Sequence, residues 1–217
     1  MYKTIELLDL DHTIAKKYFL ETEYPWMIIE KIKNIILELS EKLDKKEYKQ
    51  IKEDVWVHNT AKIFDSAYIS GPCIIGANTE IRHCAFIRGN VLVGENCVVG
   101  NSCELKNVIL FDNVQTPHYN YVGDSILGYK AHMGAGSITS NVRADKQIIK
   151  IHAEEDIDTG LKKMGAIIGD HVEVGCNAVL NPGCVVGRGA MIYPTTCARG
   201  IIKENTVLTN TGKVLTK

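Results

Sequence analysis

The sequence predicts a mainly β protein built as a parallel β-helix of hexapeptide repeats, with a short helical segment before it. An aliphatic or aromatic residue recurs at every sixth position from Val57 to Phe111, and again from Ile168 to Ile192. A second, mostly small residue follows four positions later, as at Ala61 and Cys73, and glycine often follows the aliphatic residue directly. Helices repeat every 3.6 residues and flat strands every 2. A period of six instead indicates short strands that stack into coils of three hexads each.

Composition places the chain among ordinary soluble proteins. Its 217 residues are 45% hydrophobic and 24% charged, which suits one domain with an appendage or two small domains. A formal net charge of -1 does not favour nucleic acid or an anionic membrane as a partner. No apolar run approaches the roughly 18 residues that a membrane span needs, and the charged N-terminus is unlike a signal peptide. We therefore expect a cytoplasmic protein.

The seven cysteines are expected to be reduced. Four of them occupy the small-residue position of the repeat, where a thiol packs as a compact hydrophobe: Cys73, Cys97, Cys103 and Cys184. Their spacings match no zinc motif and their number is odd. We expect packing residues and no metal.

Residues 1–54 are predicted to form a helical segment or cap. The stretch from Leu8 to Thr13, LDLDHT, matches the Asp-x-Asp-x-Thr signature of haloacid-dehalogenase phosphatases. Those enzymes need an α/β domain, however, and the repeats begin about forty residues later. The alternative is that Asp9 or Asp11 caps a short helix through Phe19.

A longer helix is predicted from Trp26 to about Leu43, after Pro25. Its isoleucines and leucines form one apolar stripe, with lysines and glutamates on the opposite side. Such a stripe must pack on something. The open end of the β-helix is one candidate, because a terminal coil needs a cap, and a neighbouring subunit is the other. Residues 41–53 would end the helix and link it to the coils.

The second unit, residues 55–217, contains the repeats. Residues 55–143 make roughly five coils of about 18 residues. The phase slips after Phe111, and such irregularities concentrate at functional sites. The period vanishes over residues 143–164, which we interpret as an inserted loop with a short hairpin that projects from the coils. Two further coils and a last strand follow.

Arg88 and Lys106 are the first candidate site residues. They lie eighteen residues apart, which is one full coil, and each directly follows an inward aliphatic residue. Two cations about 5 Å apart repel by about 3 kcal/mol at an effective dielectric near 20. A bridging phosphate would explain the stack, and so would two side chains that splay apart into water. His118 lies two hexads beyond Lys106, where it could act in proton transfer or be structural.

The stretch from Pro117 to Asn141, PHYNYVGDSILGYKAHMGAGSITSN, closely resembles one enzyme family. It is similar to the acetyltransferase half of bifunctional N-acetylglucosamine-1-phosphate uridyltransferase/glucosamine-1-phosphate acetyltransferases. FIRGNVLVG and CELK come before it at the family's spacing, and the inserted hairpin is more like the archaeal form. The resemblance implies a left-handed β-helix, although crossover rules alone favour the right hand. No trace of the nucleotidyltransferase domain is found, so no pyrophosphorylase activity is expected.

The resemblance also implies roles for single residues. His118 matches the general base, and Arg88, Lys106, Tyr121 and Asn141 match residues that bind the amino-sugar phosphate. His132 stands where the family usually has an asparagine. The residues that correspond to the acetyl-CoA site are Ala135, Cys176, Pro194 and Arg199. Cys176 replaces a serine, Tyr193-Pro194 replaces a small-residue turn, and the usual late arginine is Asn210 with Arg199 nearby. The acceptor half is therefore better matched than the cofactor half.

The implied function is the transfer of acetyl from acetyl-CoA to the amine of an amino-sugar 1-phosphate of the glucosamine 1-phosphate type. The family works as a homotrimer with sites between the subunits. One alternative is a non-catalytic sugar-phosphate-binding or scaffold protein that partners a separate nucleotidyltransferase. Another is a γ-type carbonic anhydrase with zinc on histidines, but no third histidine follows His83 and His118 closely. The hexosamine itself is left open.

Overall fold

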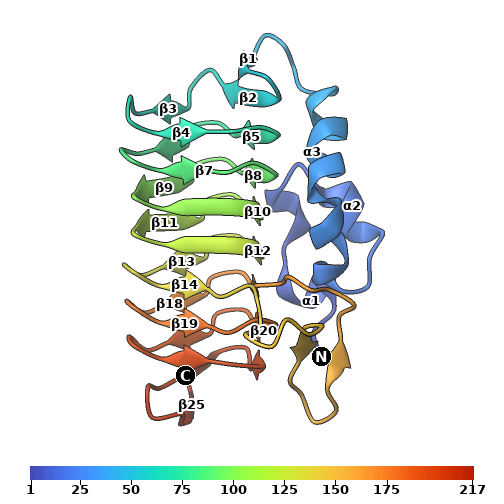
Figure 1. The fold of residues 1–217 in the computed structure, drawn as a ribbon, viewed down its shortest axis with the longest axis vertical. Helices are drawn as coiled ribbons and strands as arrows, with labels where there is room; N and C mark the ends of the chain where they lie inside the picture. Colours follow the sequence, from blue (N-terminus) through green and yellow to red (C-terminus); the bar gives the residue numbers. More distant parts are fainter.

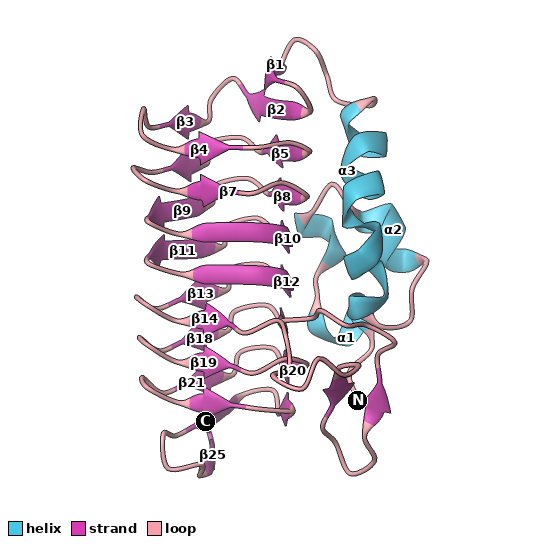
Figure 2. Cartoon of the chain, in the orientation of Figure 1, coloured by secondary structure: helices cyan, strands magenta, loops and turns pink.

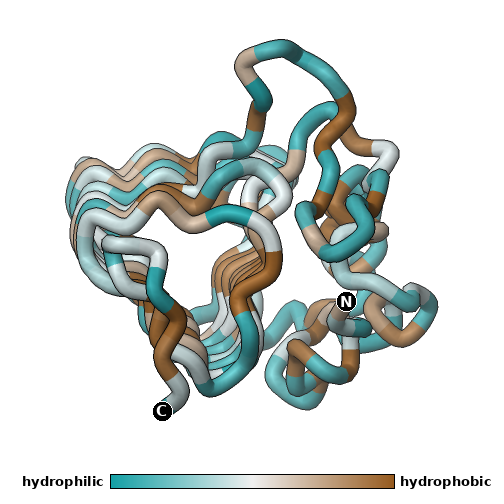
Figure 3. Tube along the Cα trace, turned by 90° about the horizontal axis from the view of Figure 1, so that it is seen from below, coloured by the Kyte–Doolittle hydropathy of each residue, from teal (hydrophilic) through white to brown (hydrophobic).

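The computed structural model describes all 217 residues, and residues 55–217 form the predicted parallel β-helix. The coils stack into a column with the N-terminal helices alongside it (Figures 1 and 2). Seen end-on, the coils superpose as a triangle (Figure 3). The repeat residues from Ile75 to Leu105 are fully buried. The sixfold period therefore marks the inward side chains, as expected.

Three faces make up the column, and within each face neighbouring strands pair in parallel. The first face consists of β4 (Tyr68–Ile69), β7 (Phe86–Ile87), the first part of β10 (Glu104–Leu110) and of β12 (Tyr121–Leu127), β14 (Ile138–Thr139), β19 (Val179–Leu180) and β22 (Cys197–Ala198). The second face consists of β2 (Val55–His58), β5 (Cys73–Ile75), β8 (Val91–Val93), the last parts of β10 and β12, β17 (Ala166–Ile168), β20 (Cys184–Val186) and β23 (Ile201–Ile202). The third face consists of β3 (Lys62–Ile63), β6 (Glu80–Ile81), β9 (Val98–Asn101), β11 (Gln115–His118), β13 (His132–Met133), β18 (Glu173–Val174), β21 (Met191–Ile192) and β24 (Thr206–Leu208).

The phase slip lies earlier than predicted. Val93 pairs with Leu110 and not with Phe111, so the coil that contains Lys106 is one residue short. The shortening falls at the corner after Lys106, where Asn107 replaces the two-residue step Gly89-Asn90 of the coil above. The next coil is equally short, with Asp124 at the corner. As a result β10 and β12 run around the corner as continuous seven-residue strands.

The N-terminal segment contains α1 (Thr4–Leu7), η1 (Leu10–His12), α2 (Lys16–Leu20), η2 (Pro25–Lys31) and α3 (Ile32–Ser40). The predicted helix from Trp26 is thus a 3₁₀ helix as far as Lys31 and becomes an α-helix only at Ile32. Its apolar stripe covers the second face, beside β5, β8 and β10, and does not cap the open end as the cap interpretation expected (Figure 1). The ends of the column are instead extended by β1 (Tyr48–Lys52) and β25 (Val214–Thr216), which pair antiparallel with β2 and β24.

The second face explains this position of the helices. Its strands β5, β8, β17 and β20 are apolar at three successive residues and buried throughout, as in CII and VLV. Strands buried on both sides read as continuous apolar runs, so the outward residues Ile74, Leu92 and Ile109 require a cover. The isoleucines of α3 provide it, because Ile32, Ile35 and Ile36 are at most 2% exposed.

Residues before α2 are fixed to a corner of the column by hydrogen bonds. The Asp9 N–H donates to Asp170 Oδ2 at 2.7 Å, and the Asp112 N–H donates to the His12 carbonyl at 3.0 Å. Asp9 caps only the three-residue η1, by accepting from the Asp11 N–H, and Phe19 lies in the separate helix α2. The Asp-x-Asp motif therefore serves as a cap and an attachment point.

The inserted loop contains the predicted hairpin, β15 (Lys150–Ile151) and β16 (Ile157–Asp158). It does not project freely. Ile149, Ile151 and Leu161 are buried, and the backbone of the hairpin lies so close to Gly183 that an added Cβ there would come within 2.8 Å of the Lys150 carbonyl. The insertion therefore folds back along the lower coils, below the N-terminal helices (Figure 1).

Candidate functional site

Arg88 and Lys106 stack in adjacent coils of the first face, as the eighteen-residue spacing predicts. Phe86 pairs with Glu104 and Ile87 with Leu105, which sets the two cations side by side in the next position. Each cation nevertheless has a carboxylate partner. Arg88 Nη1 lies 2.6 Å from Glu104 Oε1, and Lys106 Nζ lies 3.0 and 3.1 Å from the two oxygens of Asp124. The stack is therefore charge-compensated and does not need a phosphate to exist.

Asp124 is the buried centre of a polar cluster at this corner. The residue is 3% exposed and occupies the left-handed region with a φ of 45°. Besides Lys106, it accepts hydrogen bonds from Asn107 Nδ2 at 2.9 Å and from Asn141 Nδ2 at 2.5 Å. Asn107 also donates to the Ile29 carbonyl of η2, so the cluster touches the N-terminal segment. Sequence reasoning overlooked Asp124 and Asn107.

Tyr121 completes the cluster from the outer side. A Cβ added to Gly123 would lie 2.5 Å from Tyr121 Oη and 3.0 Å from Asn141 Nδ2, so the phenol and the amide meet over this glycine. Burial raises the pKa of Tyr121, and the charges of Asp124 and Glu104 raise it further. The phenol therefore remains a proton donor at neutral pH. Lys106, Tyr121 and Asn141, predicted together from the sequence, are brought together by the fold.

His118 lies at the other edge of the first face, where β11 of the third face ends. Its side chain is exposed. The chain turns through Tyr119 and Asn120 and enters β12 at Tyr121. Gly123, which neighbours Lys106 in register, lies two strand residues farther on, about 7 Å. His118 and the Asp124 cluster thus flank one narrow face.

The buried residue Asn120 fixes the position of His118 and was also missed from the sequence. Its Oδ1 accepts from the His118 N–H at 3.1 Å, and its Nδ2 donates to the carbonyls of Gly134 at 2.8 Å and Ser137 at 3.1 Å. These bonds tie the turn after His118 to the coil below. An asparagine four residues after a buried threonine, in the small-residue position of the repeat, was the available signal.

Three of the predicted cofactor residues stack directly below His118. The Gly136 N–H donates to the His118 carbonyl, the Asn177 N–H to that of Ala135, and the Thr195 N–H to that of Cys176. Successive coils therefore place His118, Ala135, Cys176 and Pro194 in one column along the edge. The Ala135 N–H makes no hydrogen bond within the chain, whereas those of Gly134 and Gly136 do. It is free to bind an oxygen of a ligand.

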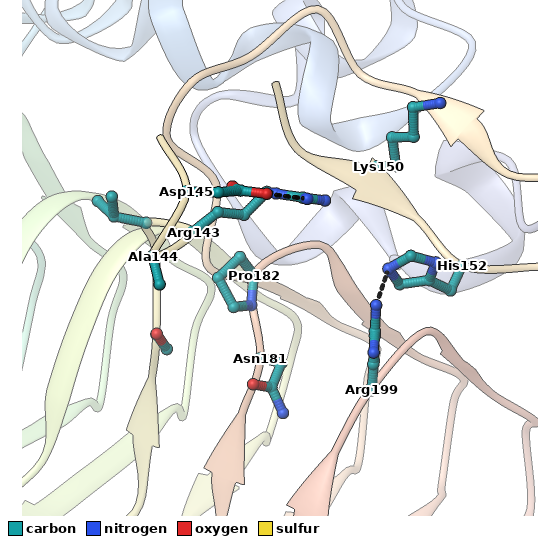
Figure 4. Close-up of a pocket in the computed structure, with 10 residues that line it drawn as sticks. Arg143, Ala144, Asp145, Lys150, His152, Asn181, Pro182 and Arg199 are labelled. Carbon is teal, nitrogen blue, oxygen red and sulfur yellow. Dashed lines mark hydrogen bonds and ion pairs between the residues drawn. The ribbon is translucent and has the colours of Figure 1, made fainter. Parts of the chain in front are cut away.

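Arg199 is not part of this column. The register from Leu105 through Val122, Thr139 and Leu180 to Ala198 places Arg199 on the edge of Arg88 and Lys106. There it lines a cavity of about 440 Å³ under the inserted hairpin, with its Nη2 2.7 Å from His152 Nε2 (Figure 4). The four predicted cofactor residues are therefore divided between two edges.

His132 also lies apart from the Asp124 cluster. It is on the third face, in β13, and its Nδ1 is 2.7 Å from Glu173 Oε2. Both line a cavity of about 510 Å³ together with Lys130 and Gln115. His132 therefore has a carboxylate partner on the third face and does not reach the acceptor site that the sequence assigned to it.

The remaining titratable groups form no metal centre. No three His, Cys, Asp or Glu side chains lie close enough together to hold an ion. His83 hydrogen-bonds to Ser66 Oγ at 2.8 Å and lies two coils above His118, about 10 Å away. Cys97 and Cys184 are buried, which raises the pKa of each thiol to about 12, so they pack as expected. None of the helices has the length and apolar character needed to cross a bilayer.

Comparison with known proteins gives a consistent set of relatives. A family model described as the GMPPB C-terminal domain matches residues 69–158. The bifunctional sugar-1-phosphate nucleotidylyltransferase/acetyltransferase of Sulfurisphaera tokodaii is 33% identical over 88% of this chain and 49% of its own length. The bifunctional protein GlmU of Methanococcus maripaludis is 31% identical over 99% of this chain and 53% of its own. The chain thus spans about half the length of the curated relatives it matches.

Among solved structures, a hexapeptide transferase family protein from Anaplasma phagocytophilum is similar with 20% sequence identity. The match covers 74% of this chain and 78% of that chain, with a TM-score of 0.42.

Proposed function

We propose that this chain is an acetyl-CoA-dependent N-acetyltransferase. Archaeal bifunctional sugar-1-phosphate nucleotidylyltransferase/acetyltransferases, which are homologous to it over most of its length, support the proposal. The acceptor is an amino-sugar 1-phosphate of the glucosamine 1-phosphate type. One observation carries the proposal: the Asp124 cluster and the exposed His118 flank a single narrow face, with the column of Ala135 and Cys176 directly below His118.

The acceptor phosphate binds at Arg88 and Lys106. Arg88 is 46% exposed at its side chain and pairs with Glu104 at the surface. An exposed ion pair contributes little, so a phosphate dianion can replace Glu104 and take two parallel N–H bonds from the guanidinium. Lys106 is held by Asp124 on its inner side and supplies a fixed positive charge.

The sugar ring is oriented by Tyr121 and Asn141, which lie on the side of Lys106 away from Arg88. The phenol donates a hydrogen bond, since its raised pKa keeps it protonated. Asn141 is pinned to Asp124 through one N–H and keeps its carbonyl oxygen for a sugar hydroxyl or the amine. Asp124 itself is a positioning residue, because its carboxylate is consumed by Lys106, Asn107 and Asn141.

The chemistry is a direct displacement. His118 accepts a proton from the acceptor ammonium, and histidine is suited to this role near neutral pH. The free amine attacks the thioester carbonyl, the N–C bond forms, the C–S bond breaks, and coenzyme A leaves as a thiol after taking up a proton. The unpaired Ala135 N–H is available to stabilise the oxyanion that develops. Acetyl-CoA would lie along the column of Ala135, Cys176 and Pro194.

A thiol-release assay with acetyl-CoA tests the proposal. Purified protein should release coenzyme A with glucosamine 1-phosphate, and mass spectrometry should find the N-acetylated product. Unphosphorylated glucosamine should react poorly, because nothing else on this face would bind its anomeric end as Arg88 and Lys106 do. Tight binding of the sugar phosphate without any acetylation would instead support the non-catalytic sugar-phosphate-binding protein.

A further inference from the structure

The first face continues above Arg88 with two exposed aromatic rings. Phe86 is 40% exposed and Tyr68, one coil above it, is 56% exposed. They pair in register and meet edge to face, with ring centroids 5.7 Å apart. The Arg88 guanidinium carbon lies 6.0 Å from the centroid of Phe86, and Lys52 Nζ lies 5.0 Å from that of Tyr68. Both rings thus keep exposed surface beside a cation, where a ligand can reach them.

The position of these rings relative to the phosphate site determines which part of a ligand they would contact. Tyr121 and Asn141, which face the sugar, lie below Lys106, and Ala135 and Cys176 lie lower still. The sugar therefore leaves the phosphate site downward. Any group on the far side of the phosphate must leave upward, over Phe86 and Tyr68. Tyr68 lies two coils above Glu104, the residue beside Lys106, so this surface spans about 10 Å.

We propose that Phe86 and Tyr68 form a nucleoside subsite, so that the acceptor includes nucleoside-diphosphate amino sugars. This inference rests on the proposed function, and it names the substrate class of the same site. The diphosphate lies along Lys106 and Arg88, and the base stacks on the exposed face of Phe86 or Tyr68. Aromatic rings stack with any base because every base has a π-face. Lys52 Nζ lies over the Tyr68 ring and keeps further N–H groups for a carbonyl oxygen of the base.

Calorimetric titration with UDP, which contains no sugar, tests the subsite directly. UDP should bind wild-type protein, and Phe86→Leu and Tyr68→Leu should each weaken binding by about tenfold, the effect expected for loss of one stacking contact. Both rings are exposed, so neither substitution threatens the fold. Phe64→Leu is the matched control, because Phe64 also has a cation over its ring, Lys62 at 4.5 Å, and an edge contact, His83 at 4.8 Å, but lies toward the third face.

The thiol-release assay with two acceptors provides a second readout. The ratio of kcat/KM for UDP-glucosamine to that for glucosamine 1-phosphate should fall about tenfold in Phe86→Leu and stay at the wild-type value in Phe64→Leu. If UDP binds through Phe86 but neither sugar is acetylated, the subsite stands and the proposed function fails. If UDP does not bind, or binds both aromatic variants as well as wild type, the subsite is overturned even when glucosamine 1-phosphate is acetylated.

Discussion

At the residue scale, the buried carboxylate of Asp124 changes the interpretation of the stacked cations Arg88 and Lys106. The sequence alone predicts that Arg88 and Lys106 repel each other. The structure shows that Lys106 instead neutralises a residue that is 3% exposed. A hexad pattern shows which residues point inward or outward. It does not show which side chain at a corner forms an ion pair with the coil above, as Asp124 does with Lys106. The resemblance assigned Lys106 and Asn141 to one site, but it did not predict that Asp124 joins them.

Lys106→Ala should therefore lower the free energy of unfolding, by about 1–3 kcal/mol, because Asp124 loses its charge partner and keeps only the two asparagine amides. Urea denaturation of the unliganded protein measures this loss. Arg88→Ala is the matched control, since Arg88 and Glu104 are at the surface, and its midpoint should equal that of wild type. Equal midpoints for wild type and Lys106→Ala would show that the ion pair between Lys106 and Asp124 does not stabilise the fold.

Asp112 supports a prediction about pH. Burial raises the pKa of Asp112 above its ordinary value, so the folded state binds this proton more tightly than the unfolded chain does. Stability contributed by the carboxyl is then greatest below the unfolded pKa of about 4 and declines as pH rises through the raised folded pKa. In Asp112→Asn, which keeps the acceptor for the Glu95 N–H, the unfolding free energy should decline less than in wild type over this window.

Unfolding measured at several pH values between about 4 and 7 gives both slopes. Asp65→Asn, at an exposed position, serves as the control and should follow the wild-type slope. A steeper decline in Asp112→Asn than in wild type would contradict the assigned direction of the shift.

At the element scale, the N-terminal segment is a lateral cover of the second face. Its amphipathic stripe was predictable, and the partner was not, because any apolar surface satisfies such a stripe. The informative signal was in the coils, where strands such as CII and VLV carry an extra apolar residue that the sixfold period does not explain. The tight corners at Asn107 and Asp124 were likewise visible only as a phase slip, which the sequence placed four or five residues too late.

Ile36→Ala should destabilise the protein by about 2–5 kcal/mol, since Ile36 is fully buried between α3 and the second face and its loss leaves a cavity. Ile14→Ala, at a residue that is 45% exposed in the same segment, should change the unfolding midpoint little. Thermal or urea unfolding of both variants compares them. If the two variants unfold alike, the N-terminal segment is not packed on the coils.

At the scale of the whole molecule, the helices and the hairpin lie along one side, so the first and third faces stay open (Figure 3). We propose that three copies of the chain assemble around these exposed edges, as the resemblance in the sequence implies. Analytical ultracentrifugation should then give three times the 24.1 kDa chain mass. A monomer at micromolar concentration that still turns over would show that one chain holds a complete site.

The proposed catalytic arrangement depends most directly on His118, and one comparison tests it. His118→Ala should lower kcat for acetyl transfer to glucosamine 1-phosphate by about 10²–10⁴-fold, the range for loss of a general base. Calorimetry should show unchanged affinity for the sugar phosphate, because the Asp124 cluster is intact, and His171→Ala, on another edge of the column, should match wild type. A His118→Ala enzyme within about threefold of wild type would contradict the assignment of His118 as the base.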